Sequence, residues 1–191
     1  MGSSRVLELP DTEKNRVGKY VLMRADIKIV FMGVCGCGKT TLAERTAQYL
    51  GCDPVFEADM FHPVEMKEKM RAGIPLTDED RWPWLEKLNG AIRESGDKTI
   101  VMTCSALRKV YRQRLLEGAE DKVIFFFLDA PQEVILERVN ARQHEYMPVS
   151  LLGSQFETLE RPDADEPVKF IPVSGTEDET FEHIKSVLAS L

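Results

Sequence analysis

Short apolar runs alternate along this chain with longer segments of mixed polarity. Five of the runs are predicted to be strands, at 27–32, 54–58, 99–103, 122–128 and 168–173. Helices are predicted in the segments between and after them, at 41–50, 63–72, 83–94, 107–117, 131–143 and 179–191. Apolar strands that alternate with helices are typical of a parallel sheet covered on both faces. The pattern therefore predicts an α/β fold of three layers.

Residues 1–26 are weakly patterned, so we predict an N-terminal extension over 1–26 and one domain over 27–191. The chain has 191 residues, 43% of them hydrophobic, which suits one compact core. Its formal net charge of −7 argues against nucleic acid or an anionic membrane as the main partner, because both select basic surfaces.

The sequence also bears on where the protein works. No run of about 18 apolar residues is present, and the N-terminus lacks the apolar stretch of a secretory signal. The four cysteines lack the spacing of a zinc site, and a chain of this length needs no disulfides. We therefore expect reduced thiols, no membrane span and a cytoplasmic protein.

A glycine-rich segment follows the first predicted strand and precedes a predicted helix. Residues 33–40 read GVCGCGKT and satisfy G-x-x-x-x-G-K-[ST] in the context that a phosphate-binding loop requires. Such a loop holds ATP through its backbone N–H groups, a lysine on the β- and γ-phosphates and a hydroxyl on Mg²⁺. The nucleotide-binding residues are predicted to be Gly33, Cys35, Gly36, Cys37, Gly38, Lys39, Thr40 and Thr41.

Two features of this loop leave alternatives. The loop indicates a nucleotide but not a reaction, although the guanine-reading strings N-K-x-D and D-x-x-G are absent and the chain length favours a small-molecule kinase. Cys35 and Cys37 stand where any small residue suffices. A second hypothesis is that the loop amides and Lys39 lower a thiol pKa and make that thiol oxidisable.

The second predicted strand ends in acidic residues. Asp59 follows it at the edge where an open α/β sheet binds ligand. It could accept the proton of an acceptor hydroxyl or hold Mg²⁺, with Glu57 assisting, and a solvated turn acid or helix cap is the alternative. Downstream, Arg81 and its neighbouring tryptophans could form an acceptor wall, although tryptophan is more often core. The helix at 83–94 is predicted to begin with Pro83 in its first turn, after an acidic turn.

Two basic segments complete the predicted site. Arg108 and Arg112 are spaced to share one helix face and could bind an anionic substrate, or the face could simply be solvated. Arg138 and Arg142 precede a segment, 143–153, that we predict to be irregular. Mobile lids over phosphates carry such arginines, which stabilise the charge in transfer.

Taken together, these segments resemble the gluconokinase family of small P-loop kinases, which are related to shikimate and nucleoside monophosphate kinases. The resemblance covers about residues 27–191. It rests on five segments in order: GVCGCGKTT at 33–41, DMFHP at 59–63, KMRAGIPLTDEDRWPWL at 69–85, CSALRKVYRQRLL at 104–116 and SQFETLE at 154–160.

The resemblance implies phosphorylation of D-gluconate at its 6-hydroxyl by ATP and Mg²⁺, giving 6-phosphogluconate for the pentose phosphate pathway. It implies a nucleoside-monophosphate-kinase-like fold with a lid at about 138–157, and a homodimer. Carried over by position, Thr40 and Asp59 would serve the metal and Lys39, Asp59, Arg138 and Arg142 would be catalytic. His62, Arg81, Arg108 and Arg112 would contact gluconate, and residues 174–176 would lie near adenine.

Other functions stay open at this point. A shikimate-type or nucleotide kinase would share the phosphate loop, although the basic 108–112 region and the DMFHP string favour a polyhydroxy acid as acceptor. A catalytically silent nucleotide-binding regulator is the alternative from another class. Acceptor-dependent ADP release separates these readings.

Overall fold

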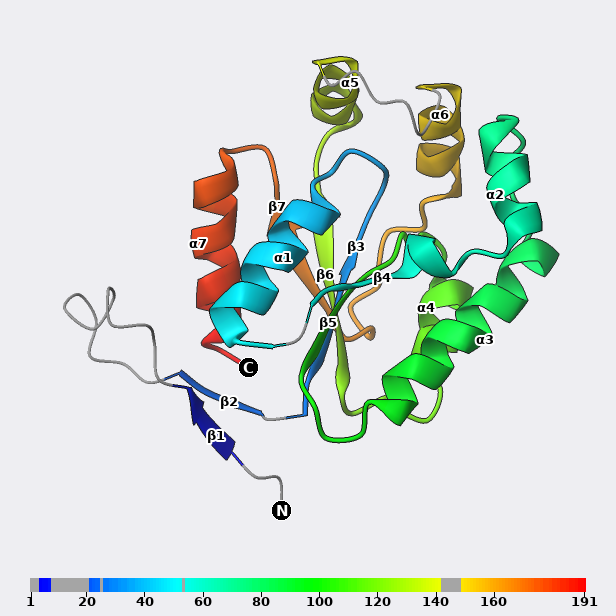
Figure 1. Cartoon of the computed structure of the whole chain (residues 1–191). Coiled ribbons are helices and arrows are strands. Elements are labelled where there is room, and N and C mark those ends of the chain that lie inside the picture. The colour runs from blue at the N-terminus through cyan, green and yellow to red at the C-terminus, as the bar shows by residue number, and fades with distance from the viewer. Residues whose placement is uncertain (1–3, 8–20, 25, 53, 142–148) are drawn as a thin grey trace.

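The computed structural model describes residues 4–7, 21–24, 26–52, 54–141 and 149–191. Its centre is a parallel sheet of five strands in the order β4-β5-β3-β6-β7 (Figure 1). The strands are β3 (Lys28–Met32), β4 (Phe56–Glu57), β5 (Ile100–Thr103), β6 (Val123–Asp129) and β7 (Val168–Pro172). The predicted parallel α/β sheet is confirmed.

The register of the sheet brings the strand ends together. Phe31 of β3 pairs with Thr103 of β5 and with Phe126 of β6, and Glu57 of β4 also pairs with Thr103. The segments that follow β3, β4, β5 and β6 therefore start at one edge of the sheet. The chain moves from β3 to the outer strand β4, returns to β5 beside β3 and then crosses to β6 on the other side of β3. The carboxyl end of β3 is therefore the place where an open α/β sheet binds ligand.

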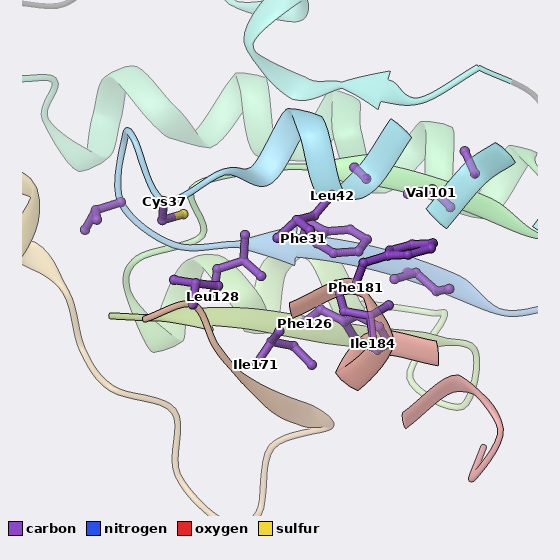
Figure 2. Packing of buried hydrophobic residues seen from close by; sticks show 14 of the residues in the cluster. Phe31, Cys37, Leu42, Val101, Phe126, Leu128, Ile171, Phe181 and Ile184 are labelled. Atoms are coloured by element: carbon purple, nitrogen blue, oxygen red, sulfur yellow. The ribbon is translucent and has the colours of Figure 1, made fainter. Parts of the chain in front are cut away.

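Helices cover both faces of the sheet, as the apolar strands predicted. Helices α1 (Lys39–Leu50) and α7 (Glu177–Leu188) lie on one face, and α3 (Asp78–Glu94) and α4 (Lys109–Leu116) on the other (Figure 1). On the first face, Phe31, Phe126, Phe181 and Ile184 pack in one buried cluster (Figure 2). Adjacent residues of β3 point to opposite faces, so Val30 and Met32 belong to the core under α3 and α4.

The remaining elements lie around this sandwich. The 3₁₀ helix η1 (Ala58–Phe61) and α2 (Val64–Arg71) follow β4, and α5 (Gln132–Ala141) and α6 (Val149–Thr158) lie beyond the carboxyl ends of the strands (Figure 1). In the N-terminal segment, β1 (Ser4–Leu7) and β2 (Val21–Arg24) pair antiparallel. Weak patterning over 1–26 did not predict this hairpin.

Three predictions about the elements were wrong. Helix α3 begins at Asp78 instead of Pro83, because Thr77 and Asp80 form a reciprocal capping box that starts the helix, and Pro83 lies inside it. The strand predicted at 54–58 is limited to Phe56–Glu57, because the chain turns into η1 at Ala58. The irregular segment predicted at 143–153 is helical from Val149 onward.

Candidate active site

The phosphate loop connects β3 to α1 and depends on its glycines. Gly33, Gly36 and Gly38 have φ angles of 137°, 82° and 98°, which residues other than glycine rarely adopt. A Cβ atom on Gly36 would lie 2.5 Å from Cγ2 of Val139 in α5. Two features therefore require glycine at position 36: the positive φ angle of the loop and the close approach of the loop to α5.

The Lys39 ammonium is held by the loop itself. Its Nζ donates to the carbonyl oxygen of Gly33 at 3.0 Å and to that of Val34 at 2.8 Å, which leaves one of its three N–H groups for a ligand. Burial opposes its charge, but the attraction of Cys37, Asp59 and nearby thiols outweighs burial and raises the pKa of Lys39. The side chain therefore stays a cation at neutral pH, beside the exposed Thr40 that follows it.

Cys37 differs from the oxidisable thiol that the sequence allowed. Cys37 is buried, and burial raises the pKa of its thiol although Lys39 acts in the opposite direction. The hypothesis of a lowered thiol pKa is therefore wrong for Cys37. Burial and the nearby Asp59 also raise the pKa of Cys104, at the end of the β5 region, to about 12.

Asp59 lies across the strand edge from the loop, at the start of η1. Its side chain is 75% exposed, and its charge contributes to the raised pKa of Lys39. The strands that precede the two residues end at the same end of the sheet. Helix α3 holds the start of η1, because Nε1 of Trp84 donates to the carbonyl oxygen of Ala58 at 2.9 Å. Asp59 is thus an accessible carboxylate on a rigid support.

His62 adjoins Asp59 but is largely buried. Its Nδ1 lies 4.0 Å from Asp59 Oδ1, and its ring stacks on Trp84 with 4.4 Å between centroids. Burial lowers the pKa of His62 despite the nearby carboxylate, so the ring is neutral at neutral pH. Trp84 is core, as the alternative reading held, whereas Trp82 is exposed and meets the ring of Tyr111 edge-on.

Arg81 and Arg108 approach each other around Tyr111. Arg81 donates to the carbonyl oxygen of Thr77 at 3.2 Å and to the Tyr111 hydroxyl at 3.3 Å. Arg108 donates to the carboxylates of Asp78 and Glu160, and the Tyr111 hydroxyl also donates to Asp78. Two half-buried guanidinium groups therefore both contact Tyr111, and Asp78 accepts hydrogen bonds from Arg108 and from the Tyr111 hydroxyl.

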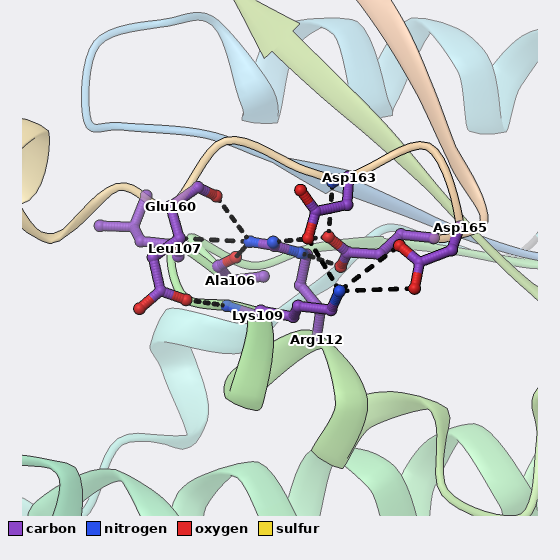
Figure 3. A network of polar contacts seen from close by, with 8 residues as sticks. Ala106, Leu107, Lys109, Arg112, Glu160, Asp163 and Asp165 are labelled. Atoms are coloured by element: carbon purple, nitrogen blue, oxygen red, sulfur yellow. Dashed lines mark hydrogen bonds and ion pairs between the residues drawn. The ribbon is translucent and has the colours of Figure 1, made fainter.

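Arg112 does not share this surface. Arg108 is the residue that precedes α4, in extended conformation, while Arg112 lies within the helix and is completely buried. Its Nε and Nη2 atoms donate to the carboxylate of Glu166 at 2.6 and 2.9 Å. Its Nη1 donates to the carbonyl oxygens of Ala106, Leu107 and Glu160 (Figure 3). The expected substrate-facing pair of Arg108 and Arg112 is therefore not formed, because Arg112 is fully bonded inside the protein.

The structure describes one of the two predicted lid arginines. Arg138, on α5, donates to the carbonyl oxygens of Val173 at 2.5 Å and Gly175 at 3.3 Å. The structure thus brings Arg138 to the 174–176 segment that the resemblance places near adenine. Arg142 lies outside the described residues.

Sequence reasoning missed several residues near the site. Asp78 and Tyr111 orient the two arginines, and Glu160 accepts from Arg108 and from the N–H of Lys109 at 2.7 Å. Gln155, on α6, accepts a hydrogen bond from the phosphate loop. Glu160 and Gln155 both lie in the SQFETLE segment that carries part of the family resemblance, and that was the available signal.

Comparison with known proteins decides the family. A family model described as an AAA domain matches residues 29–150. The thermosensitive gluconokinase of Escherichia coli K12 is 45% identical, over 72% of this chain and 73% of its own length, and the gluconokinase of Gluconobacter oxydans is 44% identical, over 77% and 82%. The crystal structure of a gluconokinase from Sinorhizobium meliloti superposes with a TM-score of 0.79 at 38% identity, covering 87% of this chain and 93% of that one.

The chain belongs to the gluconokinase family. The fold is accordingly that of a P-loop kinase, and the resemblance stated from the sequence is confirmed. In the parts of the chain that the structure describes, no helix has the length and apolar character needed to cross a membrane.

Proposed function

We propose that this member of the gluconokinase family transfers the γ-phosphoryl group of ATP to the 6-hydroxyl of D-gluconate, with Mg²⁺. The observation that carries the proposal is that the phosphate loop with Lys39 and the exposed Asp59 follow strands that end at the same end of the sheet. The gluconokinase relatives support gluconate as the acceptor.

The donor side follows from the loop. The loop amides and the free N–H of Lys39 bind the phosphates, and the Lys39 charge offsets the negative charge of the group in transfer. Arg138 and Arg142 are proposed to act on the ATP phosphates from a lid at about 138–157, with residues 174–176 beside the adenine. Closure over the phosphates would exclude water and limit ATP hydrolysis.

The metal would be held by oxygen atoms. Mg²⁺ in kinases takes one or two protein oxygens together with phosphate oxygens and water. The described residues contain no group of three or more His, Cys, Asp or Glu side chains that could hold a metal by themselves. The exposed hydroxyl of Thr40 and carboxylate of Asp59 fit this requirement, and a bound Mg²⁺ would neutralise charge between the β- and γ-phosphates.

The acceptor side is built from Asp59 and its neighbours. Asp59 is proposed to orient the 6-hydroxyl and accept its proton. Arg81 and Arg108 carry the positive charge for the gluconate carboxylate, and His62, neutral and stacked, would offer a hydrogen-bonding nitrogen. We leave Arg112 out of this site because its donors are bonded to Glu166 and to backbone carbonyls.

A panel assay tests the proposal. ADP release is measured with Mg·ATP and D-gluconate, shikimate, nucleoside monophosphates or related sugar acids, with Lys39→Ala as the control. We expect turnover on gluconate that the variant loses. Turnover on another panel member alone would retain a kinase and reject gluconate, and silence from folded, ATP-binding protein would favour the regulatory reading.

The assembly and the domain limits are further proposals. The family resemblance implies a homodimer that works in the cytoplasm. Analytical ultracentrifugation of the purified protein measures whether it is a dimer. We propose that 27–191 forms the catalytic unit, so a chain that begins at Asp26 should keep the turnover of the full chain.

A further inference from the structure

We propose that Gln155 is a positioning residue for phosphoryl transfer, which ties α6 to the phosphate loop and fixes the first half of that loop. The inference rests on the proposed kinase function. Its basis is one contact: the backbone N–H of Cys35 donates to Oε1 of Gln155 at 2.7 Å, between residues 120 positions apart.

The N–H groups of the loop fall into two sets. Those of Gly33, Cys35 and Cys37 are occupied within the protein. Gly33 donates to the carbonyl oxygen of Ser105 at 3.2 Å, Cys35 to Gln155, and Cys37 to the carbonyl oxygen of Val34 at 3.5 Å. Among the residues that the structure describes, no acceptor bonds the other set. That set includes the N–H groups of Gly36, Gly38, Lys39, Thr40 and Thr41. Gln155 therefore leaves the donors of the anion site available and anchors a neighbouring peptide.

Helix α6 can anchor the loop because it is itself held against the core by other contacts. Leu152 is buried in the core, and just beyond the helix Arg161 binds Asp129 at the end of β6 with two hydrogen bonds of 2.8 and 2.6 Å. Phe156 packs on the same core. In the conformation that the structure shows, α6 is thus held to the sheet by contacts other than Gln155, and the Gln155 side chain links this position of the helix to the loop.

Loss of the anchor should disturb the reaction more than binding. Without Oε1, the peptide at Cys35 is free to shift, and a displacement of about 1 Å in a reacting geometry can cost about 10²-fold in rate. The five remaining N–H groups and Lys39 still bind the phosphates. For Gln155→Ala we therefore expect kcat to fall by about 10-fold or more while the Kd of ATP changes by less than about 3-fold.

A conservative variant separates this role from a merely structural one. Gln155→Glu keeps an acceptor oxygen at the same reach, so kcat should stay near that of the wild type. Its added negative charge near the phosphates should raise the KM for ATP. Gln113→Ala, an exposed glutamine on α4, is the matched control and should change neither constant.

The experiment measures kcat, the KM and the Kd for ATP, Tm and the exchange rate of the Cys35 amide in the four proteins. The proposal expects faster Cys35 exchange in Gln155→Ala only, with kcat lost in Ala and retained in Glu at unchanged Tm. It is overturned if Cys35 exchange is unaffected by Gln155→Ala, if kcat is unaffected, or if Ala and Glu lose kcat equally. A wild type that turns over no acceptor rejects the proposed function instead, and the exchange rate still tests the contact.

Discussion

The structure places Arg112 in the protein interior, whereas Arg108 lies near the acceptor side, and substitution of Arg112 tests this difference most sharply. Its side chain is 0% exposed and that of its partner Glu166 is 7% exposed, and the two form a bidentate pair. Removal of one partner of such a pair leaves a buried charge uncompensated, at a cost of about 3–5 kcal/mol. Arg112→Met should therefore destabilise the protein by about that amount.

The expected shift in melting temperature follows from the chain length. In domains of 150–250 residues, each kcal/mol lowers Tm by about 2–4 °C. Arg112→Met should thus lower Tm by about 6–20 °C, measured by differential scanning calorimetry. The double variant Arg112→Met/Glu166→Leu carries no unpaired charge at this position. Its loss of unfolding free energy should therefore be smaller than the sum of the losses in the two single variants, by about 2 kcal/mol or more.

Kinetics complete this test. Because the Arg112 side chain is buried and bonded within the protein, the double variant should keep the gluconate KM of the wild type within about 3-fold, assayed well below its Tm. The reasoning is refuted if Arg112→Met leaves Tm within about 2 °C of the wild type while the gluconate KM rises more than about 10-fold. That result would return Arg112 to the substrate site.

Two further changes test the site, and a third tests the pH dependence of the Arg112–Glu166 pair. Gly36→Ala should abolish turnover and weaken ATP binding, because the Cβ would lie 2.5 Å from Val139 Cγ2 at a φ of 82°; near-normal nucleotide titration by calorimetry would contradict this. Asp59→Asn should lower kcat by about 10²-fold with little change in the Kd of ATP, and unchanged kcat removes Asp59 from catalysis. Burial opposes the charge of Glu166, but Arg112 outweighs it and holds the pKa below the ordinary 4.5. The pair's stabilisation is thus present above pH 4.5 and lost as pH falls through the lowered pKa, so Glu166→Gln should show a shallower loss of Tm on acidification.

Features written in short stretches of sequence could be predicted. The strands follow from runs such as 122–128, whose residues are buried on both faces of the sheet, and the phosphate loop follows from glycine spacing and its position after β3. The edge that carries Lys39 and Asp59 follows from parallel topology alone. These signals are local, and tertiary contacts did not override them.

Features set by distant partners could not be predicted. From helical spacing, Arg112 was predicted to lie on the surface. Its partner Glu166 is 54 positions away, and no pattern close to Arg112 in the sequence indicates that contact. The start of α3 was misplaced because the acidic run after Thr77 was taken for a turn, when Asp80 completes a capping box. The contact of Gln155 with Cys35 depends on how α6 packs, which composition and periodicity do not encode.

The most direct measurement for the whole account is identification of the product. The protein is incubated with Mg·ATP and D-gluconate, and the mixture is analysed by ³¹P NMR and mass spectrometry, with Lys39→Ala in parallel. The account predicts a gluconate monophosphate whose phosphorus couples to the C6 protons, formed with one ADP per product and absent from the variant. Phosphate on another hydroxyl, or ATP-binding protein that forms no phosphorylated gluconate, would contradict it.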